Sequence, residues 1–302
     1  MKNIVHNFFK GNNNRLSGLA QLTIYTLLVS IGFVYIYPIL YMISSSLKST
    51  SDLVNPMVSW IPMTLYLDNF KKAITVLDYL PSLLKGTVVT LLPAFLQMIV
   101  TAVVGYGFAL YDFKFKKIIF IMMIMTFVIP IQVYMIPRYV LFFELNLLGS
   151  PLAIILPALF GHGLNSTIFI LIFYQFFRMV PKSIHEAAKI DGAGPFKTFL
   201  VIHVPLAVPA FITVFLFGLV WYFNETYIAS LFLGVEYPNI QFRLASFVSE
   251  FESQYASEQL IQINEGIRLA ATLLTILPML IVYFTIQRWF VEGVEKTGVT
   301  GE

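Results

Sequence analysis

Six side chains in long apolar stretches have the chemistry to bind a polar solute. Sugars present hydroxyl groups beside apolar ring faces, so aromatic planes next to amides and carboxylates suit them. The strongest cluster is WYFNETY, residues 221–227, and its Glu225 is the only carboxylate well within an apolar stretch. Polar groups inside a bilayer are costly and tend to face a cavity or a partner. We therefore predict a solute path that includes Trp221, Asn224, Glu225, Tyr227, Gln132 and Asn165.

The same cluster has a second interpretation. Trp221 and Tyr227 would be anchors at the membrane interface, where aromatic side chains are common. Glu225 would then lie near the outer headgroups or pair with a partner protein. Both interpretations stay open from the residues alone.

Other kinds of chemistry are absent from the sequence. GAGPFKT, residues 192–198, differs from a phosphate-binding loop, which needs G-x-x-x-x-G-K-[ST] after a strand. The chain has no cysteine, which excludes disulfides, zinc–thiolate sites and cysteine nucleophiles. A net charge of +3 is too small to indicate a nucleic-acid partner. We predict no catalytic residue, no metal site and no cofactor bound by this chain.

A short polar segment, HEAAKIDGAGPFKTF at residues 185–199, interrupts the apolar stretches. Ser183 and Glu186 have the spacing of a capping box, so we predict a helix from there to about Ile190. Asp191-Gly192 is a turn signal, and Pro195 favours a second helix start. Helices this short are marginal in water, so another surface must pack against them. The segment is either a docking element or a loop folded back on its own domain.

The composition places the elements that carry these residues in a bilayer. The chain has 302 residues, of which 58% are hydrophobic and only 12% are charged, against about 25% charged in soluble domains. A transmembrane helix needs about 20 mostly apolar residues. Six segments qualify, at residues 21–47, 87–110, 118–136, 152–177, 206–233 and 267–286. Five prolines, at positions 38, 93, 130, 157 and 278, lie within them and are expected to kink helices.

The distribution of basic residues predicts the orientation. With six spans, 12 of the 19 lysines and arginines fall on the side of the N-terminus. This bias makes that side cytoplasmic and places both termini there. We expect a cytoplasmic N-terminal segment at 1–20, a six-helix membrane domain at 21–287 with a cytoplasmic loop at 178–205, and a cytoplasmic tail at 288–302. In the long outer loop 234–266, Leu244, Phe247, Val248, Phe251 and Tyr255 predict an amphipathic helix.

Residues 186–209, EAAKIDGAGPFKTFLVIHVPLAVP, closely resemble the EAA loop of permease subunits in ATP-binding-cassette (ABC) importers. The matching positions are Glu186, Ala187, Ala188, Asp191, Gly192, Ala193, Phe199, Pro205 and Pro209. Segments such as GYGFALYDFKFKK, NLLGSPLAIILP and QRWFVEGV look like the carbohydrate-importer branch, and their order resembles the six-span permease of the maltose type.

The resemblance implies an all-α integral membrane protein with the type I ABC importer permease fold in a bacterial cytoplasmic membrane. It implies a second permease subunit that forms a heterodimer with this chain. It also implies two ABC ATPases and an extracellular solute-binding protein. ATP and Mg²⁺ would bind the ATPases. Glu186, Ala187, Ala188, Asp191, Gly192, Ala193, Phe199 and Pro205 would couple to an ATPase. The tail, residues 298–302, has Thr300 where the family usually has lysine, and Lys85-Gly86-Thr87 stands where the family often has Asn-Ser-Leu.

Three alternatives remain beside a sugar importer. The same architecture could import a polyol phosphate or a peptide. An ion-coupled secondary transporter would require inverted repeats around ionisable groups at the membrane centre and would leave the EAA-type loop unexplained. The third alternative is a scaffold protein without transport activity. Co-purification with an ATPase discriminates between them.

Overall fold

The computed structural model describes residues 18–256 and 262–299, and this part contains helices and no strand. The all-α prediction is confirmed for it. Contacts divide the chain into two units, 1–73 with 255–273 and 74–254 with 274–302. Most of the predicted N-terminal segment, with the residues at 257–261 and the last three of the tail, lies outside the described residues.

The first unit contains α2 (Gly18–Ser46), α3 (Thr50–Val54), the start of α4 (Asp68–Leu77) and the start of α17 (Glu265–Val299). Most apolar side chains of α2 are exposed, as expected of a helix that meets lipid. The chain after α2 is held by Asn69, whose amide donates to the carbonyls of Ser46 (2.9 Å) and Lys48 (2.8 Å). These bonds use carbonyl groups that the end of a helix would otherwise leave unpaired.

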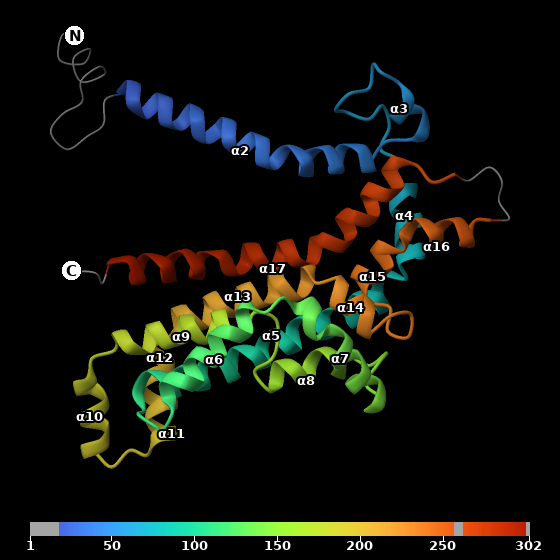
Figure 1. The fold of residues 1–302 in the computed structure, drawn as a ribbon. Coiled ribbons are helices and arrows are strands. Elements are labelled where there is room, and N and C mark those ends of the chain that lie inside the picture. Colours follow the sequence, from blue (N-terminus) through green and yellow to red (C-terminus); the bar gives the residue numbers. More distant parts are fainter. Residues whose placement is uncertain (1–17, 257–261, 300–302) are drawn as a thin grey trace, which may run out of the picture. The chain divides into compact units, whose positions relative to one another are not determined.

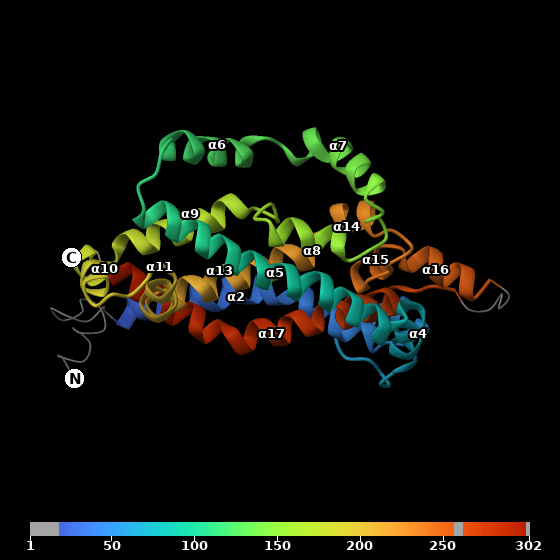
Figure 2. The same cartoon turned by 90° about the horizontal axis from the view of Figure 1, so that it is seen from below.

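The second unit is built on α5 (Tyr79–Leu110), which packs against α9 (Ser166–Met179) and α13 (Val208–Asn224). Gly105 permits a close approach, because a Cβ there would lie 2.7 Å from Cβ of Phe173 and 3.0 Å from the carbonyl oxygen of Ile170. Small residues serve this purpose between membrane helices, where van der Waals packing drives association. Figure 2 shows α6 (Lys116–Val128) and α7 (Ile131–Glu144) following one another along one side of α8 (Leu152–Leu159) and α9.

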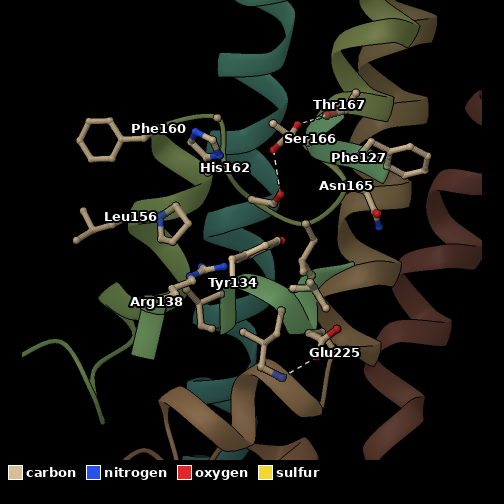
Figure 3. A pocket seen from close by; sticks show the side chains of 18 of the residues that line it. Phe127, Tyr134, Arg138, Leu156, Phe160, His162, Asn165, Ser166, Thr167 and Glu225 are labelled. Atoms are coloured by element: carbon tan, nitrogen blue, oxygen red, sulfur yellow. Dashed lines mark hydrogen bonds between the residues drawn. The ribbon is translucent and has the colours of Figure 1, made fainter. Parts of the chain in front are cut away.

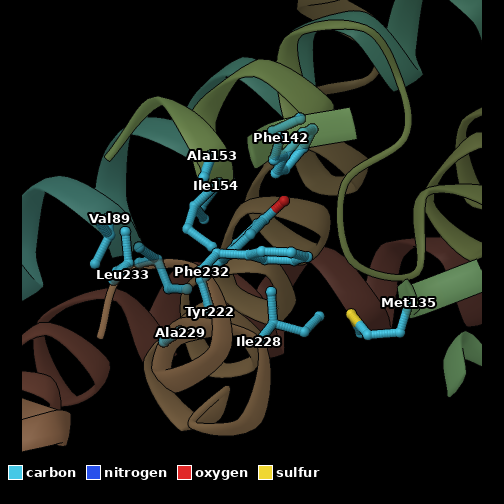
Figure 4. Packing of buried hydrophobic residues seen from close by; sticks show 13 residues of the cluster. Val89, Met135, Phe142, Ala153, Ile154, Tyr222, Ile228, Ala229, Phe232 and Leu233 are labelled. Atoms are coloured by element: carbon cyan, nitrogen blue, oxygen red, sulfur yellow. The ribbon is translucent and has the colours of Figure 1, made fainter. Parts of the chain in front are cut away.

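A second set of short helices completes this unit. Three follow α13 along the chain, α14 (Tyr227–Phe232), α15 (Ile240–Ala245) and α16 (Phe247–Gln254). The predicted amphipathic helix is thus split at Ser246, and Phe247 and Phe251 are buried while Val248 is exposed. The buried cluster around Phe232 joins α7, α8, α13 and α14 (Figure 4). Its aromatic contacts include Phe142, 5.1 Å from Phe232 between ring centroids.

Three of the six predicted spans are single helices long and apolar enough to cross a membrane, namely α2, α5 and α17 up to Arg288. The third predicted span falls on a bent pair, α6 with α7 at 95°. The fifth predicted span, 206–233, is α13 followed by α14, and residues 195–206 before α13 are bent from it by 80°. Pro130 lies at the first bend, where it is the N-cap of α7. A proline there ends the preceding helix because it lacks a backbone N–H and clashes with the turn before it.

The fourth predicted span is not one helix. Residues 152–177 form α8 and most of α9, separated by 160–165, so neither helix alone has the length of a span. Gly161 and Asn165 in this break have φ of +75° and +52°, which helical residues do not adopt. The two glycines of GHG, residues 161–163, were a signal for this break that the apolar pattern concealed. The connection between the third and fourth predicted spans, 118–136 and 152–177, is also shorter, since α7 runs to Glu144.

Candidate functional site

The segment after α9 folds as two short helices about a glycine turn. They are α10 (Lys182–Ile190) and α11 (Pro195–Thr198), and α11 continues through a π-helical turn (Phe199–His203) into α12 (Val204–Leu206). Figure 1 shows α10 and α11 beyond the end of α9. At the turn, Gly192 has φ +75° and the amide of Ala193 donates to the carbonyl of Ala188 at 2.9 Å. This bond is part of the Schellman pattern, whose left-handed residue is usually glycine.

The first helix of the loop begins one residue earlier than predicted. α10 begins at Lys182, so Ser183 lies inside the first turn, and it cannot cap the helix as a capping box requires. The amide of Ile184 donates to the carbonyl of Pro181 at 3.1 Å, which closes this turn from outside the helix. Pro195 is the first residue of α11, as predicted.

One face of this loop packs on its own unit. Ala188, His185, Phe199 and His203 are buried. The imidazole of His203 lies 5.8 Å from that of His185 and 4.9 Å from the ring of Tyr106, between centroids. We call the following six residues the loop anchor: Tyr106, Tyr111, Phe177, His185, Phe199 and His203. They join the ends of α5 and α9 to both halves of the loop.

The loop anchor keeps an imidazole uncharged. His203 precedes the fifth predicted span, and it is fully buried. Burial, with a smaller contribution from the neighbouring His185, lowers the pKa of His203 to about 4. A charged imidazole would lose its hydration here without gaining a carboxylate partner in the described part of the anchor.

The other face of the loop is open to solvent. Ile190 is 86% exposed and Phe196 is 71% exposed, one on each side of the glycine turn. Glu186, Ala187 and Asp191 are exposed beside them, Ala193 is half-buried, and Pro205 is exposed on α12. The predicted coupling residues are therefore divided: Ala188 and Phe199 hold the loop to its own unit, and Glu186, Ala187 and Asp191 are accessible.

A cavity of about 1320 Å³ lies in the second unit between α6–α7 and the helices α5, α8, α9, α13 and α14. Two of the six predicted path residues line it, Glu225 and Asn165 (Figure 3). Glu225 follows the last residue of α13, and its carboxylate accepts the amide N–H of Ile228 at 2.8 Å. It is thus at a helix break rather than within a helix, and its carboxylate caps the start of α14.

The other four predicted path residues do not line this cavity. Trp221 stacks on Phe169 with centroids 4.9 Å apart and belongs to the packing of α13 on α9. Asn224 donates to the carbonyl of Val220 at 2.8 Å, near the end of its own helix. Tyr227 and Gln132 are exposed outside the cavity lining. The interpretation of the aromatic residues as a sugar platform therefore has no support from this arrangement.

Gln97 is buried in this region, but its polar atoms are used by the fold. Its amide donates to the carbonyl of Leu164 (2.6 Å) and to the hydroxyl of Ser166 (3.0 Å), and its oxygen accepts from the hydroxyl of Tyr222 (2.5 Å). The network links α5 and α13 to the break between α8 and α9. Its role is to satisfy backbone groups that the broken fourth span exposes.

Arg138 and Gln241 are among the polar residues of the cavity that sequence reasoning missed. Arg138 lies on α7, and Gln241 lies on α15 and is 7% exposed. Both were counted among the outer loops, because α7 extends beyond the third predicted span and α15 lies wholly within the predicted outer loop 234–266. In the sequence IPRYVLFF, Arg138 is a cation among apolar residues, and this was the signal that could have identified it as a cavity residue.

Comparisons with known proteins agree on one family. The family described as "Binding-protein-dependent transport system inner membrane component" matches residues 97–296. The arabinooligosaccharides transport system permease protein AraQ of Halalkalibacterium halodurans is 28% identical over 90% of this chain and 93% of its own length. The lactose transport system permease protein LacG of Rhizobium radiobacter is 27% identical over 92% and 95%.

The polygalacturonan/rhamnogalacturonan transport system permease protein YtcP of Bacillus subtilis is 28% identical over 94% of this chain and 99% of its own length. A solved bacterial ABC transporter involved in the import of the acidic polysaccharide alginate has a chain with the same fold. Its TM-score is 0.75, at 20% identity, over 90% of this chain and 96% of that one.

Proposed function

Because the chain belongs to the family of binding-protein-dependent transport system inner membrane components, we propose that it is a permease subunit of an ATP-driven importer for a sugar or oligosaccharide. It passes the solute from an external binding protein to the cytoplasm by alternating access. It is not itself an enzyme; ATP and Mg²⁺ bind to two separate ATPase subunits. A second permease subunit completes the membrane part.

The sugar assignment is supported by the relatives, whose names cover arabinooligosaccharides, lactose and polygalacturonan/rhamnogalacturonan. They differ in solute while matching almost the whole length of this chain. A shared fold with different solutes fits an importer in which the cavity and the binding protein determine which sugar is transported.

The observation that carries the proposal is the two-faced loop at 178–205. One face is held by the loop anchor, and the other exposes Ile190 and Phe196 on either side of the turn. Two large exposed apolar side chains beside carboxylates are suited to insertion in a groove of a partner. Because the loop anchor joins the loop to α5 and α9, a movement of that partner would be transmitted to helices that line the cavity. Coupling of this kind needs contacts that differ between the two states.

The test is made on the complex purified from membranes with its partner subunits. Ile190→Asp with Phe196→Asp should remove the ATPase subunits from the purified complex and lower ATP-driven sugar uptake at least tenfold, because each buried charge would be unpaired. Val235→Asp is the matched control, since Val235 is 79% exposed but lies in a predicted outer loop. It should leave both measurements unchanged.

Two results would contradict the proposal. One is a complex from which no nucleotide-hydrolysing subunit can be recovered. The other is uptake that follows an ion gradient in vesicles free of ATP.

A further inference from the structure

Arg138 presents a guanidinium in the cavity that makes no salt bridge within the described chain. Its guanidinium carbon lies 5.2 Å from the ring centroids of both Phe142 and Phe232. Among the described residues, no ion pair includes Arg138. Arg138 is half-buried, and aromatic faces stabilise a guanidinium without supplying the negative charge of an ion pair.

The other charged side chain of the described lining, Glu225, forms no ion pair with Arg138. Glu225 is the only carboxylate among the described lining residues, and its oxygen accepts the N–H of Ile228. Arg138 is the only arginine or lysine in the same set. The described lining therefore has one cation and one carboxylate that form no ion pair with each other. The planar fork of donors of Arg138 matches a carboxylate.

Gln241 supplies a second and independent observation. Its side chain is 7% exposed and lines the same cavity. Both polar atoms of its amide lack a hydrogen-bond partner within the described chain. Its neighbour Asn239 differs, because its side-chain oxygen accepts the amide N–H of Phe242 at 2.8 Å as a helix cap. A buried amide with no partner is costly unless a ligand supplies the missing donor and acceptor. A sugar hydroxyl is both.

We propose that this cavity binds an acidic saccharide, with the carboxylate of a uronate paired to Arg138 and a hydroxyl group bonded to the amide of Gln241. This inference rests on the proposed function and names its substrate class. A sugar phosphate is disfavoured, because its dianion would bring one more negative charge than a uronate into a cavity that holds one arginine and already contains Glu225. Both residues belong to segments of the predicted outer side, so a solute delivered from outside meets them first.

The experiment measures ATP-driven uptake by the whole complex with its binding protein. One probe set is the trisaccharide fraction from digests of pectin, alginate and hyaluronan. The second set is the same fractions after reduction of their carboxyl groups to alcohols, with maltotriose and lactose added. Glucose 1-phosphate forms a third arm. Wild type should take up a member of the first set at least tenfold faster than its reduced form.

Variants connect that preference to the cavity. Arg138→Gln should lower uptake of the acidic probe at least tenfold, and Arg138→Lys should recover part of it. Gln241→Leu should raise the KM for the acidic probe with less effect on kcat. Arg243→Gln is the matched control, because Arg243 is paired with Glu250 at 3.4 Å and does not line the cavity. It should leave uptake of the acidic probe unchanged.

Several outcomes would overturn the inference. If only neutral sugars or the phosphate ester enter, the acidic substrate class is wrong while an importer remains. If Arg138→Gln releases the second permease subunit from the complex, the guanidinium pairs with a carboxylate of that subunit. If no saccharide of any set enters although ATP is hydrolysed, the sugar assignment of the proposed function fails as well.

Discussion

At the scale of single residues, the glycine turn depends on the backbone conformation of Gly192. Gly192 is required by backbone conformation, because its φ of +75° is unfavourable for residues with a Cβ. Space is not the constraint, since a Cβ at Gly192 would have nothing within 4 Å. Any side chain at Gly192 would therefore strain this bend, and β-branched residues should be worst.

Gly192→Val tests this point. We expect it to cost about 1–2 kcal/mol in the local turn, to weaken binding of the ATPase subunits and to lower ATP-driven uptake severalfold. Gly194→Val is the control, because Gly194 also has an open surrounding but an extended conformation, with φ −68° and ψ 162°. Valine is favoured in such a conformation before proline. Equal losses in the two variants would show that the left-handed turn is not what matters.

At the scale of elements, the loop anchor makes the attachment of α10 sensitive to pH. The pKa of His203 is about 4 in the folded chain, against an ordinary value near 6.5. Between these two values the loosened loop binds more protons than the packed loop, so packing weakens as the pH falls through this window. Above pH 6.5 the imidazole is neutral in both states and the effect vanishes.

Hydrogen exchange of residues 182–199 measures this effect, after correction for the intrinsic pH dependence of exchange. Protection in the wild type should fall from pH 6.5 to pH 4. His203→Phe should remove most of that fall, because phenylalanine keeps an aromatic ring in the anchor without a titrating group. His162→Gln, which changes an exposed histidine elsewhere in the unit, should retain it. A decrease of the same size in His203→Phe would assign the titration to another group.

Broken elements also explain where the cavity lies. The fourth span is interrupted at 160–165 and α6 turns into α7 at Pro130, and residues of both breaks line the cavity. Backbone that leaves the helical path is tolerated in a membrane only where it is buried in protein or lines a polar space. The network of Gln97, Leu164 and Tyr222 provides that protection at the break of residues 160–165.

At the scale of the whole molecule, the absence of cysteine permits a direct test of the predicted orientation. Asp191→Cys and Glu252→Cys place single thiols at exposed positions on opposite predicted sides. A membrane-impermeant maleimide should label Glu252→Cys in intact cells and Asp191→Cys only after lysis. Wild type should remain unlabelled in both cases. The reverse pattern would invert the topology and move the 178–205 loop to the outside.

The sequence alone determined the membrane environment, the helical class and the bent loop of residues 185–199, because these depend on local properties. The apolar length of a segment decides whether it can span a bilayer. Glycine and proline act through the backbone of a few neighbouring residues. Thus Pro195 and Gly192 were assigned correctly, and three spans are continuous helices as predicted.

Only the tertiary structure decided which polar residues share a cavity. Trp221 and Asn224 looked suited to a solute path, but packing and helix ends use their side chains. Arg138 and Gln241 are about 100 residues apart in the chain and line one cavity because α7 and α15 are brought to the same region. Such a meeting depends on long-range packing between helices, and no local pattern contains that information.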